Sequence, residues 1–483
     1  MKHGLIKSIL SAVLAAALAV QMSGCADPDA LVREAFPSLS SSAAVSADSS
    51  ASSAAPLSST AESAVVSRAV SGSKRQRVAG AEVRTPRKIE QPTDTQNLKR
   101  LTVTERKAFA GGGYTAVTPD GGYRALSSDT QRALYSLIGN SVYQVANGKS
   151  VDGYVPTGRI SMAGRLTEAQ IRVTTTAYLD DHPQVFWIAN AYSYGYQGNN
   201  TILQLYSVLT QSECNAAIAA FNGKVQSILQ AMPAGLSEFG REEYLFHAIA
   251  DHCTYDDAAV TDPGRWQSFT AYGALVDGTA VCEGYSRAML LLAGNAGLQS
   301  VLIRGTGDGV AHMWNGIRID GNWYHLDITW CDSTALIYNY FNVDDQILRL
   351  THVIAPAASS LTDAQICSSS TLYNLTLPAC TSMQANYFAV RGVAVRTLDA
   401  SGDEAVVTAL APMLAAKKPT LTFRIASGNY DSTVAGLLTV SPYKLATYLK
   451  KASSRAGVRI NSQNISYVTD KADSGVNVFV SYL

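Results

Sequence analysis

One stretch, from Thr279 to Asp332, constrains this chain more than any other part of it. It carries a cysteine at an expected helix start, a histidine on an expected strand and an aspartate on the strand that follows, namely Cys282, His312 and Asp327. A nucleophile, a base and a group that orients the base are what thiol catalysis requires. Any fold proposed for the chain must therefore bring these three side chains together.

Turn and capping residues directly before Cys282 predict that a helix begins there. Residues 277–279 read Asp-Gly-Thr, and the apolar spacing that follows suits a helix ending near Gly297. In the first turn of a helix, the free backbone amides and the positive end of the dipole favour thiolate over thiol. We therefore expect Cys282 to be a reactive thiol.

The histidine and the aspartate belong to a predicted hairpin over Val310 to Trp330 that turns at Asp320-Gly321, a strong hairpin signal. A two-residue loop places Trp314 opposite Asp327, and it makes His312 and Asp327 diagonal neighbours on one face. An extra or missing loop residue would turn Asp327 to the other face. In that case His325 would face His312 and would be the rival base.

The segments around these groups resemble the transglutaminase-like superfamily of papain-type thiol enzymes, in particular a bacterial lipoprotein member. The matching segments are Gly278–Tyr285, His312–Asn315 and Gly321–Trp330, with a methionine at 313 where alanine is more usual. By this resemblance Cys282 is the nucleophile, His312 is the general base and then the acid, and Asp327 fixes the imidazole tautomer. Trp314 and Tyr285 are expected to contact the substrate.

The fold class expected from the pattern and the resemblance is α+β. A papain-like or transglutaminase-like core, with the nucleophile helix packed on an antiparallel sheet, is flanked by a helical N-terminal region and a small C-terminal α/β domain. The expected organisation is a lipoprotein signal peptide at 1–25, a disordered linker at 26–100, a helical region with a tyrosine-rich hairpin at 101–236, the catalytic core at 237–355 and the accessory domain at 384–483.

Within the N-terminal region, the residues Thr167 to Gln170 form a predicted capping box that opens a helix ending before His182. The hairpin is expected at 185–196 and 201–209, and two further helices at 212–232 and 237–251. In the C-terminal domain we expect strands at 386–395 and 421–425, helices at 403–416 and 441–456, and a closing hairpin at 465–482.

The N-terminus has the features of a secretion signal. A short basic start precedes an apolar run from Ile9 to Val20 that is too short to span a bilayer comfortably, and residues 22–25 read Met-Ser-Gly-Cys. This ending resembles a bacterial lipobox, which implies cleavage before Cys25 and lipid attachment to it. We therefore expect a protein held by lipid on the extracytoplasmic side of a bacterial membrane. The serine- and alanine-rich segment that follows, with its basic second half, is expected to be a flexible stalk.

The charge composition gives no indication of a nucleic-acid partner. Lysine plus arginine and aspartate plus glutamate number 38 each, so no overall field favours nucleic acid. The sequence predicts no metal site, cofactor or oligomer. Seven cysteines, less Cys25 and Cys282, leave an odd number, so a fully paired disulfide framework is impossible, and Cys367 with Cys380 is the pair to test first.

The function expected from these features is that of a cysteine peptidase or amidase that forms a thioester with a peptide or protein substrate. Hydrolysis is favoured because the resemblance implies proteolysis in bacterial members at least as often as crosslinking. The alternatives are a protein-glutamine transglutaminase, in which an amine takes the place of water, and a non-catalytic surface binding module that kept the fold.

Overall fold

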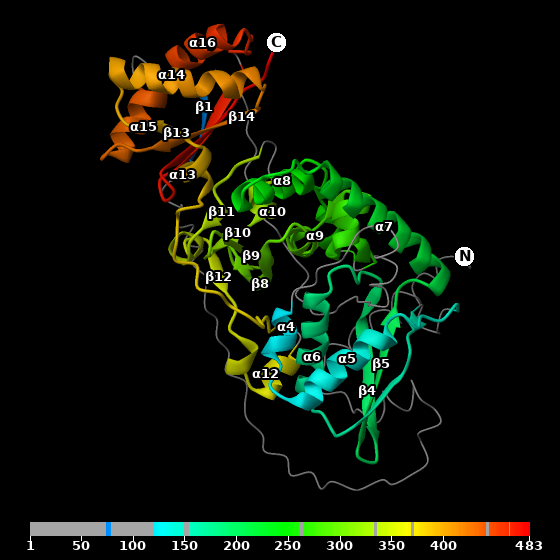
Figure 1. Cartoon of the computed structure of the whole chain (residues 1–483). Coiled ribbons are helices and arrows are strands. Elements are labelled where there is room, and N and C mark those ends of the chain that lie inside the picture. The colour runs from blue at the N-terminus through cyan, green and yellow to red at the C-terminus, as the bar shows by residue number, and fades with distance from the viewer. Residues whose placement is uncertain are drawn as a thin grey trace, which may run out of the picture.

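The structure is a computed structural model of the 483-residue chain. It describes residues 74–78, 120–148, 154–260, 262, 264–332, 336–368, 371–440, 444–462 and 464–483. The predicted signal peptide, Cys25 and all of the predicted linker except residues 74–78 lie outside this part of the chain. Figure 1 shows three groups of elements, of which the central one carries the predicted site.

The central group is a five-stranded antiparallel sheet in the order β11-β10-β9-β8-β12. Its strands are β11 Phe341–Val343, β10 Asn322–Leu326, β9 Val310–Ile319, β8 Gln299–Gly307 and β12 His352–Ile354. Helix α9, Cys282–Asn295, packs against β8 and β9. Its buried residues include a row of apolar side chains from Ala288 to Ala293. The arrangement is a mixed α+β fold with a helix on an antiparallel sheet.

The hairpin between β9 and β10 forms with the predicted register. Asp320 and Gly321 both have positive φ, 48° and 86°, as a two-residue turn of the favoured hairpin type requires. Ile319 pairs with Asn322, and the pairing ends where Asn315 meets Leu326.

The predicted continuation of β10 to residue 330 is wrong. After Leu326 the chain turns into a short helix, α10, Ile328–Cys331, whose N-cap is Asp327. The carboxylate of Asp327 accepts a hydrogen bond from the backbone N–H of Trp330, and this bond stabilises the helical turn in place of further strand pairing. Because the strand ends at Leu326, Asp327 does not pair with Trp314 across the hairpin.

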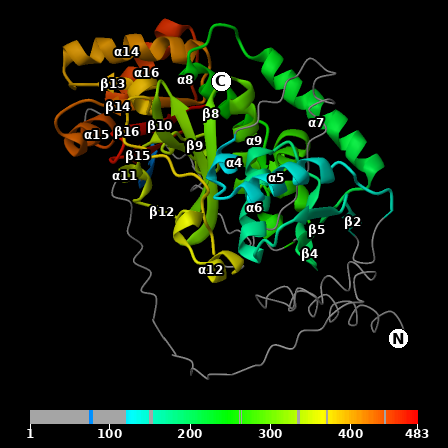
Figure 2. The same ribbon diagram turned by 60° about the horizontal axis from the view of Figure 1, so that its bottom comes forward.

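The N-terminal group lies on one side of the central sheet (Figures 1 and 2). Its helices are α4 Gly121–Ala125, α5 Asp129–Ser141, α6 Glu168–Asp181 and α7 Gln211–Ala231, and α8 Glu238–Ala250 follows. Its sheet contains β2 Val155–Pro156, β3 Ile160–Ala163, β4 Ile188–Gln197 and β5 Asn200–Ser207. The capping box at Thr167 and Gln170, the hairpin of β4 and β5 and the two long helices were all predicted. The strands β2 and β3, which pair with β5, were not.

The N-terminal and central groups share one apolar core. A single cluster of buried side chains runs from Leu134 in α5 through Phe221 in α7 and Leu291 in α9 to Phe388. The tyrosines of β4 belong to this packing. The hydroxyl of Tyr194 donates to Glu168, and the hydroxyl of Tyr196 donates to the carbonyl of Leu166. The helices of the N-terminal group are thus part of the body that supports the site.

The C-terminal group has its own core, formed by helices α14, α15 and α16 and a sheet in the order β1-β15-β16-β14-β13, in which β1 is Lys74–Val78. The elements are α13 Tyr387–Arg391, β13 Val393–Val395, α14 Ala400–Ala415, β14 Thr420–Ile425, α15 Tyr430–Leu438, α16 Lys444–Ala456, β15 Ile465–Asp470 and β16 Gly475–Phe479. Figure 1 shows α14 and α16 on the side of this sheet that faces away from the central group. Asn339 of the central group bonds to Asp470 and Asn477 of the sheet, at 2.5 Å and 2.7 Å.

Two sequence predictions for the flanking regions need correction. Residues 387–391 form a helix rather than the beginning of a strand, because Asn386 caps the backbone N–H of Phe388. Residues 74–78, within the predicted disordered linker, form strand β1, Lys74–Val78, which pairs antiparallel with β15. The edge of β15 offers unpaired backbone groups, and a short strand satisfies them.

The cysteine pair chosen for testing first, Cys367 and Cys380, forms no disulfide, since both residues are free cysteines. Cys367 packs with the cluster around Ile366 and Tyr373, whereas the thiol of Cys380 donates to the carbonyl of Pro378. Among the described residues, no helix combines the length and the apolar character needed to cross a membrane.

Candidate active site

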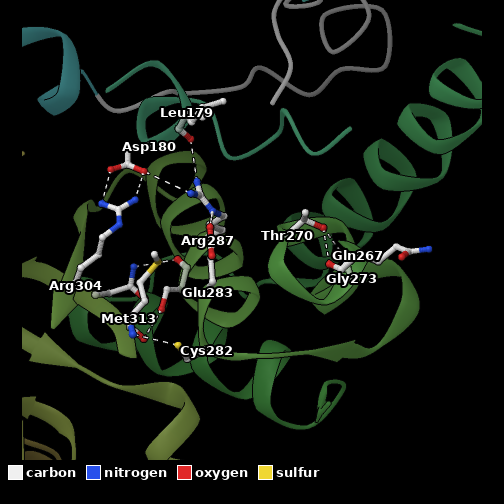
Figure 3. A network of polar contacts seen from close by, with 12 residues as sticks. Leu179, Asp180, Gln267, Thr270, Gly273, Cys282, Glu283, Arg287, Arg304 and Met313 are labelled. Carbon is white, nitrogen blue, oxygen red and sulfur yellow. Dashed lines mark hydrogen bonds and ion pairs between the residues drawn. The ribbon is translucent and has the colours of Figure 1, made fainter. Parts of the chain in front are cut away.

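Cys282 is the first residue of α9, and its side chain is held against strand β9. Its Sγ accepts a hydrogen bond of 3.1 Å from the backbone N–H of Met313, as Figure 3 shows. One helical turn later, the hydroxyl of Ser286 donates to the carbonyl of the same Met313 at 3.1 Å. Both backbone groups of Met313 are therefore bonded to α9, and Cys282 lies beside the residue that follows His312.

The thiol of Cys282 is fully buried, with 0% of the residue exposed. Burial raises the pKa of Cys282 well above its ordinary value, and the N–H bond from Met313 offsets part of this effect. The position at the helix start was expected to favour the thiolate, but desolvation of the buried sulfur outweighs it. The resting group is thus a neutral thiol that needs a base to ionise it.

His312, the predicted base, is hydrogen-bonded to Asp327. Its Nε2 lies 2.7 Å from Oδ2 of Asp327, and both residues are buried, at 2% and 1% exposure. Its other ring nitrogen, Nδ1, is buried without a hydrogen-bond partner in the part of the chain that the structure describes. A neutral imidazole that donates from Nε2 keeps a lone pair on Nδ1, so this nitrogen is able to accept a proton.

Asp327 reaches His312 by a route other than the predicted cross-strand pairing. Its backbone N–H donates to the carbonyl of Tyr340, which fixes it at the end of β10. Burial opposes ionisation of the carboxyl group, but the electrostatic attraction of His312 and the hydrogen bonds from His312 and His352 hold the pKa of Asp327 well below its usual range. Asp327 is therefore an anion that orients the imidazole.

His352 was not predicted from the sequence to belong to this site. It opens β12, is 1% exposed, and its Nε2 lies 3.2 Å from the same Oδ2 of Asp327. Burial lowers the pKa of His352, so its imidazole is neutral. No motif surrounds it in the sequence, and only the pairing of β12 with β8 brings it next to Asp327.

The rival base, His325, has both ring nitrogens bonded. Its Nδ1 accepts the indole N–H of Trp314 at 3.1 Å, and its Nε2 lies 2.8 Å from Oδ1 of Asp345. Trp314 itself is fully buried and its ring stacks on that of His312, with centroids 5.8 Å apart. Trp314 thus supports His312 from the side and has no exposed surface with which to contact substrate.

Tyr285 is likewise a supporting residue. It is fully buried, and its hydroxyl donates to the carbonyl of Cys253 at 3.0 Å and to Asp332 at 2.5 Å. These bonds fix the first turn of α9 to the segment before it and to the end of α10. The expectation that Tyr285 contacts substrate is not supported, because helix α9 turns this side chain into the core.

A buried network of charged side chains holds the start of α9 (Figure 3). Arg304 of β8 forms a bidentate ion pair with Asp180 of α6, at 2.7 Å and 2.6 Å. Arg287 of α9 contacts the same carboxylate at 3.5 Å and bonds to Glu283, the residue after Cys282, at 2.9 Å. The N-terminal group therefore supplies an anion that positions the nucleophile helix, which sequence spacing could not reveal.

Two sets of side chains within the described residues have donor atoms close enough to hold a metal ion: His312, Asp327 and His352, and separately His325, Asp345 and Cys380. In the second set, the N–H of Trp314 occupies Nδ1 of His325, so Nε2 carries the proton and bonds to Asp345. A metal-bound imidazole needs that nitrogen unprotonated, so this arrangement does not suit an ion. In the first set, Nε2 of His312 and Nε2 of His352 are both hydrogen-bonded directly to Oδ2 of Asp327.

Comparison with known proteins assigns the central region to a superfamily. Residues 228–328 match the family model described as the transglutaminase-like superfamily, and this range includes Cys282, His312 and Asp327. His352 lies beyond it. No curated protein matches the chain.

Two solved structures resemble parts of the chain. One is a crystal structure of a TGase, with 16% identity over 35% of this chain and 50% of that one, and a TM-score of 0.22. The other, from Cytophaga hutchinsonii, is described as a candidate cysteine protease, with 9% identity over 29% of this chain and 61% of that one, and a TM-score of 0.19. The chain thus spans less than two thirds of either structure, and the assignment of residues 228–328 rests on the family model.

Proposed function

We propose that the transglutaminase-like domain is a thiol enzyme that cleaves peptide or carboxamide bonds through a thioester, as a cysteine peptidase or amidase. One observation carries this proposal. His312 is hydrogen-bonded to Asp327 through Nε2 at 2.7 Å, and its Nδ1 has no partner among the described residues. Cys282 Sγ accepts a hydrogen bond from the backbone N–H of Met313, the residue after His312. A base with one nitrogen fixed and the other unbonded, beside a thiol, is the arrangement that nucleophilic catalysis uses.

In the first half of the reaction, Nδ1 of His312 takes the proton from Cys282, and the sulfur attacks the substrate carbonyl. The negative charge on the carbonyl oxygen is held by a backbone amide at the start of α9, a contribution of about 3 kcal/mol. The C–N bond then breaks, the amine leaves with the proton from His312, and a thioester remains on Cys282. Asp327 stabilises the imidazolium while it carries the proton.

In the second half, His312 removes a proton from water, and the resulting hydroxide attacks the thioester. The acid product leaves, and the sulfur regains its proton from the imidazolium. A primary amine in place of water would give a transglutaminase. We favour water because the resemblance to bacterial members implies proteolysis at least as often as crosslinking, and the sequence shows no recognisable amine-binding site.

A second candidate, a binding module without catalysis, is favoured by one observation. Cys282 is fully buried and burial raises its pKa, so a substrate carbonyl reaches the sulfur only after neighbouring side chains move. A surface module that kept the fold for stability would show such a closed site. The buried His312–Asp327 pair with its free Nδ1 weighs against it, because an orphaned ring nitrogen costs stability without a function.

The experiment that separates these candidates is labelling of the full chain with a thiol-directed acylating probe, with the modified peptide located by mass spectrometry. We expect Cys282 to be labelled in the native chain and the label to vanish in Cys282→Ala. Unfolding with urea before labelling serves as the control for accessibility. Labelling of Cys282 only after unfolding would refute the enzyme and leave the binding module.

The acceptor is then tested with a blocked glutamine peptide, with and without a primary amine, and with a labelled unfolded protein. Scission of the protein supports a peptidase, and ammonia release without amine incorporation supports an amidase. Incorporation of the amine into the peptide would show that the transglutaminase is the correct alternative.

We further propose that the protein is held by lipid at Cys25 on the extracytoplasmic side of a bacterial membrane. The apolar run from Ile9 to Val20 followed by Met-Ser-Gly-Cys supports this proposal. Incorporation of a labelled fatty acid into the native protein, and its loss in Cys25→Ser, is the expected result. Equal incorporation in both proteins would refute it.

A further inference from the structure

The carboxylate of Asp327 is shared by two histidines. Its Oδ2 lies 2.7 Å from Nε2 of His312 and 3.2 Å from Nε2 of His352, and its Oδ1 accepts the backbone N–H of Trp330 at 3.2 Å. All the side chains that meet at Oδ2 are at most 2% exposed. Because water is excluded here, each hydrogen bond to the carboxylate changes how much of its charge the other partner experiences.

The tautomer of His352 is determined by the groups that are hydrogen-bonded to its two ring nitrogens. An ionised Asp327 only accepts hydrogen bonds, so Nε2 of His352 must donate, and the neutral ring then has a bare Nδ1. The hydroxyl of Thr351, 2.8 Å away, donates to this nitrogen, and the hydroxyl of Tyr340, 3.2 Å from Thr351, completes the chain. His352 is thus a neutral donor with a fixed tautomer.

Ring packing fixes His352 further. The ring of Trp330 lies 4.5 Å from it, that of Trp314 5.1 Å and that of Tyr340 5.4 Å, between centroids. Of these, Trp314 also stacks on His312. The two histidines therefore have little freedom to exchange positions on the carboxylate.

The titratable groups that face this pair come from every neighbouring element. They are His312 and Cys282 from β9 and α9, His325 from β10, Cys331 from α10, Asp327 itself and Tyr340 before β11. Burial raises the pKa of Cys331 and of Tyr340, so both stay protonated near neutral pH. Asp327 is the anion whose charge the two histidines divide.

We propose that His352 is a positioning residue that limits how strongly Asp327 attracts the proton on His312. This inference rests on the proposed function, because it concerns the proton that passes between Cys282 and His312. When His352 donates to Oδ2, less of the carboxylate charge stabilises the imidazolium. The imidazolium then releases its proton more readily to the leaving amine, which favours breakdown of the tetrahedral intermediate.

The proposal has a directional consequence. Without the second donor, the full charge of Asp327 acts on His312, and transfer of the proton from Cys282 to His312 becomes more favourable. The thiolate then forms at lower pH. A residue that only packed the site would change the stability of the fold and leave the pH of thiolate formation unmoved.

The test is the rate of alkylation of Cys282 by iodoacetamide in the full chain, followed at this one peptide by mass spectrometry across a range of pH. His352→Phe removes the donor and keeps an aromatic ring, and His352→Gln keeps a side-chain N–H. We expect the pH of half-maximal rate to fall by about 0.5 to 1 in His352→Phe. In His352→Gln it should stay close to that of the native protein.

Two further variants make the test decisive. Thr351→Val keeps the side-chain shape, removes the hydroxyl that fixes the tautomer of His352, and should shift the midpoint in the same direction by less. It replaces His352→Phe if that variant does not fold. Asp345→Asn, which removes the charge of the carboxylate bonded to the other buried histidine and leaves that histidine beside Trp314, is the matched control and should leave the midpoint unmoved.

The outcomes separate the inference from the function. A midpoint that stays or rises in both His352→Phe and Thr351→Val, with normal alkylation of the native chain, overturns the role of His352 alone. Failure of native Cys282 to react before unfolding overturns the proposed function and the inference together. A downward shift in the two variants, absent from Asp345→Asn and His352→Gln, supports the inference.

Discussion

The hairpin of β9 and β10 carries two buried histidines, each bonded to an aspartate, and they differ in one ring nitrogen. His312 donates to Asp327 and has an unpartnered Nδ1, whereas His325 bonds to Asp345 and also accepts the N–H of Trp314. A proton can move only where a lone pair is available, so His312 is suited to catalysis and His325 to structure. The difference shows that a histidine–aspartate pair by itself does not identify a base.

The aspartates bonded to these two histidines, Asp327 and Asp345, also differ in their exposure to solvent. Asp327 is fully buried and accepts three hydrogen bonds, two of them from histidines. Asp345 begins α11, Asp345–Leu348, and about a third of its side chain is exposed, at 34%. Solvent screens the second pair and not the first, so equivalent substitutions should have unequal effects.

The largest expected effect is that of His312→Asn. It removes the only proposed proton acceptor for Cys282, so the reaction with the best substrate found should slow by about 10⁴-fold or more. The rate of the chemical step in single-turnover experiments measures it. His325→Asn is the matched variant, and a loss of comparable size there would break the distinction between the two histidines.

Asp327→Asn should follow, with a loss of about 10³- to 10⁴-fold in kcat, because the amide no longer fixes the tautomer of His312. Stability should change with pH as well. Since the folded-state pKa of Asp327 is lowered, its carboxylate stabilises the fold above the unfolded pKa of about 4, by about 2 to 3 kcal/mol, and this contribution is lost as the pH falls further.

Urea unfolding of the native protein and of Asp327→Asn at several acidic pH values measures this contribution. The native curve should fall more steeply with decreasing pH than the curve of the variant. Parallel curves would mean that the carboxylate is no better stabilised in the fold than in the unfolded chain.

His325→Phe should act on stability. It leaves the indole N–H of Trp314 buried without an acceptor and Asp345 without its donor, at a cost of about 1 to 3 kcal/mol. The free energy of unfolding from denaturant titration measures it, and kcat should change by less than about tenfold. A collapse of activity in a protein that remains folded would show that His325 takes part in the chemistry.

Asp345→Asn should have the smallest effect, a loss of at most about 1 kcal/mol in the free energy of unfolding. The pKa of Asp345 is lowered mainly by its hydrogen bond with His325, so this modest stabilisation is present above pH 4 and is lost below it. Thermal unfolding at neutral and acidic pH checks both points. A loss of free energy of unfolding as large as that in Asp327→Asn would show that solvent does not weaken the Asp345–His325 pair as proposed.

Local sequence was sufficient for much of the site. The predicted start of α9 at Cys282 is confirmed, although its N-cap is Val281, which makes no side-chain capping bond, and Thr279 lies in the two-residue strand β7, Thr279–Ala280. Asp320-Gly321 fixed the register that faces Asn315 with Leu326. Both features depend on backbone conformations that a few adjacent residues determine. Similar local signals gave the capping box of α6 and the hairpin of β4 and β5.

Other features could not be predicted because they depend on contacts between distant segments. The end of β10 was missed because Asp327 serves as a helix cap, a choice between two local structures that the surrounding core decides. Tyr285 and Trp314 were expected to face substrate, yet both are buried. Residues 74–78 form a strand only because the edge of β15 is available to pair with them.

By itself, the sequence determined that a cysteine, a histidine and an aspartate occur in segments typical of one superfamily, and where the nucleophile helix and the hairpin begin. These are properties of neighbouring residues and of side-chain periodicity. Only the tertiary structure decided which histidine keeps a free nitrogen, that His352 shares Asp327, and that the thiol is buried. Each of these depends on which groups the fold leaves with water or with a partner, and no short stretch of sequence specifies that.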